Sequence, residues 1–220
     1  MIKLPEFEKA FEYENNFYLS SDIQRLVKPI AHYELYKKTI NIPGAFVELG
    51  VFKGASFVRF LAYREMLETS NSRKFIGFDV FGEFPGATLE GDKTMLEKYT
   101  SNAGNLSISK EQLMEVIEKK GVFRNVELIQ GDITQTIPAY LKQNTGIRFS
   151  LIHLDVDLYE PSLTCLEYMY PLLSKGGILM LDDYGIWEGE TRAVDEYFRE
   201  NKIKIQRLPF AAAPSFIVKD

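Results

Sequence analysis

The sequence has little of what marks a disulfide-bonded, zinc-binding or membrane-embedded protein. Its only cysteine is Cys165, so no disulfide can form within the chain, and nothing indicates an oxidising compartment. One cysteine and two histidines are too few for a His/Cys zinc site. No apolar run is long enough to span a membrane, and the first residues lack the apolar segment of a signal peptide. We therefore expect a cytoplasmic protein with no membrane partner.

Positive charge is also scarce. The 26 lysines and arginines are outnumbered by 31 aspartates and glutamates, which gives a net charge of −5, and the basic residues do not cluster. This balance argues against a nucleic-acid partner, because phosphate backbones are bound by basic surfaces. The 220 residues are 45% hydrophobic and include 16 phenylalanines and 12 tyrosines, enough for one domain with a large core.

Apolar segments with strand character alternate with helical patterns from residue 45 to 201. This alternation is typical of an α/β domain with a doubly wound, largely parallel sheet. We expect a domain over 44–220, preceded by a helical extension and lid over 1–43 and interrupted by a loop-rich lid over 81–108. Strands are expected over 45–49, 74–80, 125–131, 148–155 and 177–183, and a closing hairpin over 202–208 and 215–219; helices are expected over 21–41, 54–67, 110–121, 134–144, 161–173 and 190–201. In the helix over 54–67 the expected buried face is Val58, Leu61, Ala62 and Met66.

In open parallel sheets, ligands bind beyond the carboxyl ends of the strands. The first strand runs into "VELGVFKGAS", where Gly50 allows a tight turn and Gly54 allows a ligand or the helix to come close to the backbone. Glu48 would repel a pyrophosphate but could accept a hydrogen bond from an ammonium group. Two glycines also occur in ordinary strand–helix turns, so this motif alone leaves both interpretations open.

The second and third strands also end in acids. Asp79 lies about thirty residues after the glycine motif, where a carboxylate can accept both hydroxyls of a ribose. Asp132 could meet an adenine amino group, and it is also a good N-cap for the next helix. Together with the glycine motif Asp79 favours an adenosine-containing ligand, while capping is the simpler role for Asp132 and binding an added one.

The fourth and fifth strands end in "LDVDLYEP" and "LDDYG". They bring Asp155, Asp157, Asp182 and Asp183 to one edge of the sheet, where their mutual repulsion would raise at least one pKa unless a cation binds. Carboxylate oxygens suit Mg²⁺, Ca²⁺ or Mn²⁺. The sequence therefore favours a divalent-cation site; the alternative is solvated strand ends, with Asp157 capping the next helix.

Four further residues lie near these motifs. His153 shares the side of the strand occupied by Asp155 and is a candidate base, although a buried core histidine is the stronger interpretation. His32 either lines the cleft or lies on the surface. Trp187 is expected to form a wall of the cleft, and Arg192 to pair with a substrate oxygen or with a neighbouring acid.

From Phe46 to Arg199 the chain resembles the macrocin O-methyltransferase (TylF-like) family of class I S-adenosylmethionine-dependent methyltransferases. The resemblance is carried by "FVELGVFKGAS", "FIGFDVFGEFP", "VELIQGDITQTIP", "LIHLDVDLYEPS", "LSKGGILMLDDYG" and "TRAVDEYF". It implies a Rossmann-like, mostly parallel seven-stranded sheet with an antiparallel last strand, S-adenosylmethionine as methyl donor, and Mg²⁺ chelating a vicinal sugar diol. The implied acceptor is a sugar hydroxyl on a glycoside, nucleotide-sugar or polysaccharide precursor.

The resemblance also implies roles for particular residues. By position, the metal ligands are Asp155, Asp182 and Asp183. The family's cofactor contacts match Glu48, Gly50 and Asp79 by position. The expected cofactor site also contains Gly54, Ser56, Asp132 and Asp155, and the expected substrate site contains Tyr159, Tyr184, Trp187 and Arg192. Leu158 stands where related catechol-type enzymes carry a lysine base, so the expected base is Asp155, with Asp157 and His32 as alternatives.

Three other functions compete with this hypothesis. A metal-dependent glycosyltransferase would explain the D-x-D motif but not the glycine loop with Glu48 and Asp79. A nicotinamide dehydrogenase is weaker still, because the phosphate-binding glycine pattern is absent. A catalytically inactive binding protein that retains the fold is disfavoured by the four acids. A homodimer is compatible with the aromatic-rich N-terminal segment.

Overall fold

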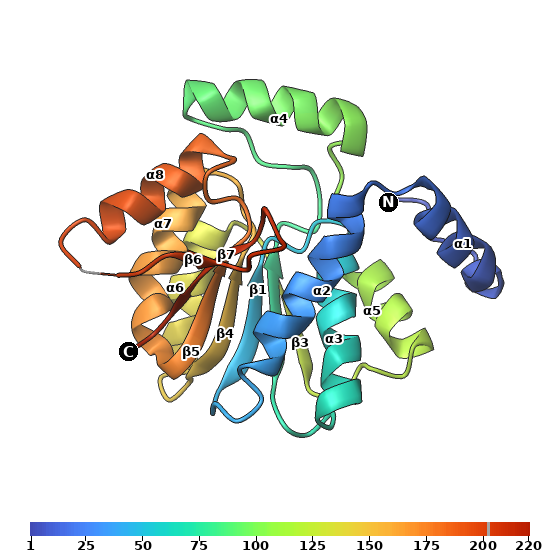
Figure 1. Cartoon of the computed structure of the whole chain (residues 1–220), viewed down its shortest axis with the longest axis horizontal. Coiled ribbons are helices and arrows are strands. Elements are labelled where there is room, and N and C mark those ends of the chain that lie inside the picture. The colour runs from blue at the N-terminus through green and yellow to red at the C-terminus, as the bar shows by residue number, and fades with distance from the viewer. Residues whose placement is uncertain (202) are drawn as a thin grey trace.

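Figure 1 shows the computed structural model, which describes residues 1–201 and 203–220. A seven-stranded sheet forms its centre, in the order β3-β2-β1-β4-β5-β7-β6. Only β7 of the described strands runs antiparallel to its neighbours, β5 and β6; the other pairs are parallel. The expected α/β, Rossmann-like sheet with a reversed last strand is confirmed.

The strands are β1 (Ala45–Leu49), β2 (Phe75–Asp79), β3 (Val126–Gln130), β4 (Phe149–Leu154), β5 (Leu173–Leu181), β6 (Gln206–Arg207) and β7 (Ser215–Val218). The α-helices are α1 (Ala10–Ser20), α2 (Ile23–Lys37), α3 (Ala55–Leu67), α4 (Glu90–Ala103), α5 (Lys110–Lys119), α6 (Ile133–Gln143), α7 (Tyr159–Tyr168) and α8 (Glu188–Tyr197). Two short 3₁₀ helices, η1 (Phe7–Lys9) and η2 (Tyr170–Leu172), complete the elements. The expected hairpin forms between β6 and β7, but the start of its first strand, Lys202, lies outside the described residues.

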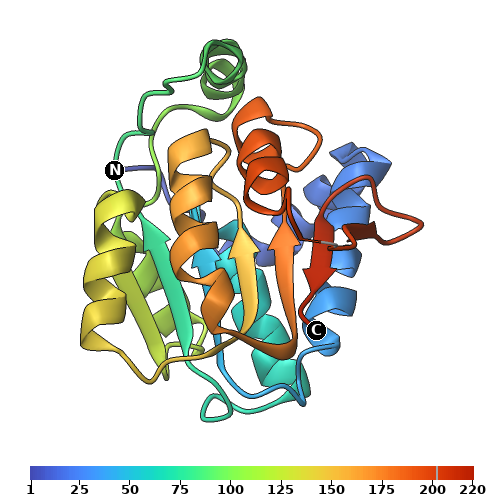
Figure 2. The ribbon, with the colours of Figure 1, turned by 90° about the vertical axis from the view of Figure 1, so that its left-hand side faces the viewer.

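Helices cover both faces of the sheet (Figures 1 and 2). On one face α2, α3 and α5 pack with an aromatic cluster in which the Phe46 and Phe75 rings stack at 4.4 Å. On the other face α6, α7 and α8 cover a mainly aliphatic layer. Strands β1, β2 and β4 are buried along their whole length, as expected for parallel strands between two layers of helices.

The buried face of α3 differs from the expected one. The structure buries Phe57, Phe60 and Arg64 together with Leu61, whereas Met66 is 68% exposed. The aromatic cluster explains the difference, because Phe60 lies 4.7 Å from Phe46, ring to ring, and fixes the rotation of the helix against the sheet.

The segment 81–108 contains more regular structure than the expected loop-rich lid. Its centre is α4, a helix of 14 residues that crosses above the carboxyl edge of the sheet (Figure 1). Glu83 and Leu106 form a short antiparallel bridge at the base of this segment. Asp92 is the only buried residue of α4, so the helix carries no apolar stripe by which the sequence could have revealed it.

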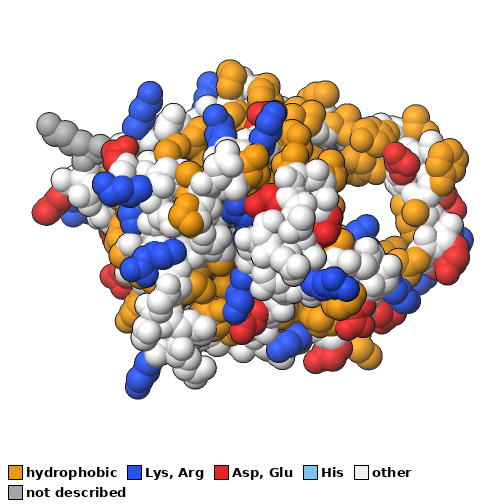
Figure 3. Space-filling model, turned by 90° about the horizontal axis from the view of Figure 1, so that it is seen from below, with side chains coloured by type: hydrophobic (Ala, Val, Ile, Leu, Met, Phe, Trp, Pro, Cys, Tyr) orange, Lys and Arg blue, Asp and Glu red, His pale blue; other side chains and the backbone are white. Residues whose placement is uncertain are grey.

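The N-terminal segment contributes to the core and also extends from it. Residues Ala31, Leu35 and Tyr36 of α2 are completely buried. In contrast, no residue of α1 is buried, and this helix stands off from the body across an opening (Figures 1 and 3). No helix among the described residues is both long and apolar enough to cross a membrane.

Candidate active site

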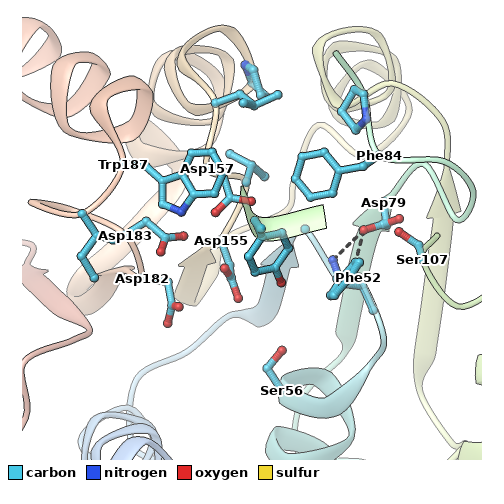
Figure 4. A pocket seen from close by; sticks show the side chains of 18 of the residues that line it. Phe52, Ser56, Asp79, Phe84, Ser107, Asp155, Asp157, Asp182, Asp183 and Trp187 are labelled. Carbon is cyan, nitrogen blue, oxygen red and sulfur yellow. Dashed lines mark hydrogen bonds between the residues drawn. The ribbon is translucent and has the colours of Figure 1, made fainter. Parts of the chain in front are cut away.

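A cavity of about 860 Å³ lies at the carboxyl ends of β1, β2, β4 and β5. Figure 4 shows four aspartates on one side of it, Asp155, Asp157, Asp182 and Asp183, and Asp79 on the other. The strand order explains the meeting, because β1 and β4 are neighbours at the centre of the sheet, with β2 and β5 on either side. The cavity is therefore the place where the sequence motifs at the ends of these four strands converge.

Asp79 holds the loop that follows β1. Its Oδ2 accepts hydrogen bonds from the backbone N–H groups of Val51 and Phe52, both at 2.9 Å, and its Oδ1 accepts one from Phe81 at 2.6 Å. Burial raises the pKa of Asp79, an effect opposed by these three donors and by the Ser107 hydroxyl. The carboxylate expected to bind a ribose thus also fixes the shape of the glycine loop.

Gly50 allows this loop to approach β4. Its φ is +89°, and an added Cβ would lie 1.8 Å from the carbonyl oxygen of Asp155. Gly54 serves packing instead: it does not line the cavity, and a Cβ there would lie 2.9 Å from Leu113 of α5. Of the two partners expected to come close to the Gly54 backbone, the structure therefore shows a helix and not a ligand.

Glu48 is buried beneath the cavity and does not line it. Its Oε1 accepts a hydrogen bond of 2.6 Å from Ser56, which does line the cavity, and its Oε2 lies 3.4 Å from His153 Nδ1. Asp132 caps α6 by accepting a hydrogen bond of 2.9 Å from the Thr134 backbone N–H, and it also lines the cavity. Its expected capping role is confirmed.

Three of the four strand-end acids form a close cluster. Asp155, Asp157 and Asp183 each offer a carboxylate oxygen, and these atoms lie within 4.8 Å of one another. The backbone of Asp157 has φ +62°, an uncommon conformation for a residue other than glycine. Asp157 does not cap α7, whose N-cap is Leu158.

Burial and mutual repulsion both disfavour the charged forms of the acids in this cluster. Burial, followed by the charge of Asp155, raises the pKa of Asp157 to about 8. Burial and neighbouring acids also raise the pKa values of Asp155 and Asp183. Asp183 Oδ2 is buried without a hydrogen-bond partner among the described residues. Three close carboxylates with one bare oxygen are a set of hard ligands suited to a divalent cation.

Asp182 faces in another direction. Its Oδ2 lies 2.5 Å from Lys28 Nζ, and its Oδ1 lies 3.3 Å from His153 Nε2 and 3.6 Å from His32 Nε2. Burial alone would raise its pKa, but Lys28 and His153 hold the pKa of Asp182 well below its usual range. The structure thus groups Asp157, and not Asp182, with Asp155 and Asp183.

The two histidines belong to the core. His32 is buried, does not line the cavity, and stacks on Phe60 with 4.8 Å between ring centroids. The expectation that it lines the cleft or lies on the surface is wrong, because α2 packs its inner face against α3. Burial lowers the pKa of His32 to about 3. His153 is the expected core histidine; burial disfavours its charge, but Asp182 and Glu48 raise its pKa to about 10.

Of the four expected substrate residues, only Trp187 lines the cavity. Tyr159 donates a hydrogen bond of 2.6 Å to Glu196, and Arg192 pairs with the same carboxylate at 2.9 Å. Tyr184 donates one of 2.8 Å to Asp195. The structure therefore contradicts a place at the cavity for these three side chains. For Arg192 the alternative, a neighbouring acid one helical turn away, is confirmed.

Besides Trp187, several residues that line the cavity were not singled out in the sequence. An aromatic wall is formed by Phe52, Phe84, Tyr99 and Trp187, with ring centroids of neighbouring pairs 5.6–6.3 Å apart. Lys28 of α2 also lines the cavity. Trp187 was expected in this wall, whereas Phe52 and Phe84 lie in recognised motifs but were not singled out. Tyr99 and Lys28 come from segments without a recognisable motif, and only the fold brings them to the cavity.

The segment 81–108 is docked on α8 through Asp92 of α4. Its Oδ1 accepts a hydrogen bond of 2.9 Å from the Gly189 backbone N–H in the first turn of α8. A carboxylate at a helix N-terminus is favourable because the free N–H groups there carry partial positive charge. A Cβ on Gly91 would lie 1.8 Å from Glu188 Oε2, so the two helices approach closely at this point.

Comparison with known proteins identifies the relatives of this chain. The family model for macrocin-O-methyltransferase (TylF) matches residues 31–208. A relative from Streptomyces olivaceus, 8-demethyl-8-(2,3-dimethoxy-alpha-L-rhamnosyl)-tetracenomycin-C 4'-O-methyltransferase, is 32% identical over 66% of this chain and 55% of its own length. Demethyldecarbamoylnovobiocin O-methyltransferase from Streptomyces niveus is 26% identical over 71% of this chain and 59% of its own length.

The chain thus spans little more than half the length of the curated relatives it matches. A solved structure is similar over more of its length. The crystal structure of the calicheamicin methyltransferase CalS11 is 27% identical, has a TM-score of 0.78, and covers 94% of this chain and 84% of its own.

Proposed function

The chain belongs to the macrocin O-methyltransferase (TylF) family. We propose that it transfers a methyl group from S-adenosylmethionine to a sugar hydroxyl with the help of a divalent cation, for which Mg²⁺ is the first candidate. One observation carries this proposal: the glycine loop held by Asp79 and the acidic cluster of Asp155, Asp157 and Asp183 line the same cavity. The proposed site for the methyl donor and the proposed site for activating the hydroxyl thus lie in one cavity.

The residues on the β2 side of the cavity fit the methyl donor. Asp79 and Asp132 offer carboxylates, Ser56 offers a hydroxyl backed by Glu48, and Gly50 keeps the backbone free of a side chain. The cavity volume of about 860 Å³ lies within the range of small-molecule sites. When bound there, S-adenosylmethionine supplies an electrophilic methyl group.

The acidic cluster fits a divalent cation, because its carboxylates are close, partly buried and repel one another. We propose that Asp155, Asp157 and Asp183 hold the ion. Asp182, which the resemblance implies as a ligand, would lie next to this cluster without being grouped with it. A divalent ion at this place would lower the pKa of a bound hydroxyl.

The proton of the hydroxyl needs an acceptor among these residues. Asp155 is the first candidate, because its side chain is 24% exposed to the cavity, and Asp157 is the second. His32 is buried outside the cavity, which removes it from this role. A carboxylate within reach of the hydroxyl acts as general base once its orientation is fixed by its neighbours.

A sugar is the acceptor class that the relatives and the cavity wall both support. One relative is named for a rhamnosyl group, and CalS11 is described as a TDP-rhamnose 3'-O-methyltransferase. In this chain, Tyr99 and Trp187 provide flat apolar surface in the wall of the same cavity. We propose that the segment 81–108 closes over the sugar and excludes water.

The test measures transfer of labelled methyl from S-adenosylmethionine to a nucleotide-linked rhamnose and to a rhamnosylated aromatic polyketide. We expect turnover with at least one acceptor, loss with EDTA and recovery with Mg²⁺. Asp183→Asn should abolish transfer and leave S-adenosylhomocysteine binding nearly normal, whereas Asp195→Asn on the outer side of α8 should have no effect. Turnover that survives chelation would remove the metal from the proposal. Calorimetric binding of UDP or GDP in place of S-adenosylhomocysteine would favour a glycosyltransferase.

A further inference from the structure

Glu190 is a carboxylate near the acidic cluster that the proposed chemistry does not use. It lies in the first turn of α8, is completely buried, and does not line the cavity. A glutamate is seldom buried unless its carboxylate has partners, because removing the charged group from water costs free energy. The partners of Glu190 therefore indicate what this side chain does in the fold.

Two hydrogen bonds of Glu190 lead to the acidic cluster. Its Oε1 accepts a hydrogen bond of 3.1 Å from the backbone N–H of Asp183. Its own backbone N–H donates one of 3.1 Å to the backbone carbonyl of Asp157. Asp157 comes after β4 and Asp183 comes after β5, so a single residue of α8 joins the two strand ends that carry the cluster.

The first turn of α8 is packed closely against the loop after β4. Gly189 allows this approach, since an added Cβ would lie 2.5 Å from the backbone nitrogen of Tyr159. Asp157 has φ +62°, a conformation that a residue other than glycine keeps only when its surroundings hold it. The hydrogen bond from Glu190 to the Asp157 carbonyl is one such constraint.

We propose that Glu190 is a positioning residue that fixes the acids at the ends of β4 and β5 relative to each other, at the spacing that a divalent cation needs. The inference rests on the proposed metal-dependent function. Close carboxylates repel one another, so without a constraint the two strand ends would move apart when no cation is bound. The hydrogen bonds of Glu190 to both strand ends oppose this movement. Contacts behind the ligands of a metal site typically contribute about 10- to 100-fold to metal affinity.

The test compares Glu190→Met with Glu190→Gln and with Glu200→Met. Methionine has no oxygen to accept from the Asp183 N–H, whereas glutamine removes the same charge and keeps an acceptor oxygen. Because Glu190 Oε2 has no hydrogen-bond partner among the described residues, the glutamine amide nitrogen displaces no bond there. Glu200 is exposed beyond the end of α8 and does not line the cavity, so its variant makes the same change in net charge away from the site.

The probe is Mn²⁺ alone, followed by electron paramagnetic resonance of the free ion. We expect Glu190→Met to bind Mn²⁺ about tenfold more weakly than the wild type. Glu190→Gln should bind at least about threefold more tightly than Glu190→Met, because it keeps the hydrogen bond to Asp183. Glu200→Met should bind within about twofold of the wild type, since salt screens a distant exposed charge.

The melting temperature in EDTA separates this role from a merely structural one. A structural contact alone would lower the melting temperature of Glu190→Met and leave the Mn²⁺ affinity of the folded protein unchanged. If Glu190→Met does not fold, Glu190→Asp takes its place: it keeps the charge, but its carboxylate is one methylene short of the Asp183 N–H. We expect Glu190→Asp also to bind Mn²⁺ about tenfold more weakly than the wild type.

The outcomes distinguish this proposal from the proposed function. If the wild type binds Mn²⁺ and Glu190→Met binds it equally well, the positioning role is wrong and the metal site stands. If Glu190→Gln binds as weakly as Glu190→Met while Glu190→Asp binds normally, the charge of Glu190 matters and its hydrogen bond does not, which also overturns the role. If the wild type itself binds no Mn²⁺, both the metal-dependent function and the role of Glu190 are overturned.

Discussion

Replacing Asp79 by asparagine tests whether one carboxylate shapes the donor loop. Asparagine keeps one acceptor oxygen, but its amide nitrogen is a donor that must face a backbone N–H now bound by the carboxylate. Two N–H groups meet Oδ2 and one meets Oδ1, so the amide oxygen is expected to stay with Val51 and Phe52, and the bond to Phe81 is lost. A hydrogen bond to a charged group contributes about 1.5–3 kcal/mol.

Relief of a buried charge offsets part of this loss, since burial raises the pKa of Asp79. We therefore expect Asp79→Asn to lower the free energy of unfolding by about 2 kcal/mol. Urea denaturation measures this value, and calorimetry with S-adenosylhomocysteine measures the donor site. The matched control is Asp22→Asn at the N-cap of α2, where Asp22 accepts from the Arg25 N–H and asparagine caps equally well.

Two results would refute the reasoning. If Asp79→Asn were as stable as Asp22→Asn, the carboxylate would not hold the loop. If the affinity for S-adenosylhomocysteine fell while stability stayed unchanged, Asp79 would act on the ribose alone. We expect both quantities to fall together.

Two further predictions follow from the site. In EDTA the free energy of unfolding should fall as pH rises from 6.5 to 8. Folding raises the pKa of Asp157 to about 8 and that of His153 to about 10, so the folded protein binds more protons than the unfolded chain in this range. Each group contributes up to about 1.4 kcal/mol per pH unit. Mg²⁺ should flatten this slope by replacing a proton, as denaturation at several pH values would reveal. Asp92→Ala should free the lid and raise the KM for the sugar about tenfold, with little change in donor affinity.

Each of these predictions has a clear contrary result. If the free energy of unfolding in EDTA rose between pH 6.5 and 8, the acids near Asp157 would already be ionised. An Asp92→Ala enzyme that loses donor and acceptor affinity equally would show that α4 supports the whole cavity. Glu97→Ala on the same helix, where the side chain is exposed, is the control for α4.

The sheet could be predicted from the sequence because each central strand is a short apolar run that ends in a glycine or an acid. The expected strand 45–49 coincides with β1 and the expected strand 74–80 contains β2, since parallel strands buried on both faces are mostly apolar. The buried Glu48 is a polar exception within β1. The motifs at the strand ends then follow from topology alone. This is why Gly50, Asp79 and Asp155 were all expected at the cavity and all line it.

What could not be predicted depends on contacts between distant segments. The helix α4 buries only an aspartate, so its sequence shows no helical stripe. Lys28 meets a partner 154 residues away, and nothing in the local pattern of α2 singles it out. The placement of Arg192 in the substrate site could have been avoided from the local sequence, because Glu196 stands four residues later on the same helix and can pair with it.

The grouping of the acids shows a similar limit. The pattern D-x-D followed by D-D establishes that four carboxylates meet, but not which of them share a ligand. That choice depends on Lys28 and His153, which hold Asp182 aside. The position of a side chain within an acidic cluster is set by its counter-ions, and these come from other elements.

The central claim is that a cation held by the acidic cluster lies next to the methyl group that is transferred. The most direct measurement is the ¹³C relaxation of S-adenosylmethionine labelled on its methyl carbon and bound to the enzyme, with Mn²⁺ added in place of Mg²⁺. We predict strong broadening of the methyl signal that disappears in Asp183→Asn. A methyl signal that Mn²⁺ leaves sharp, in an enzyme shown to bind both ligands, would contradict the account.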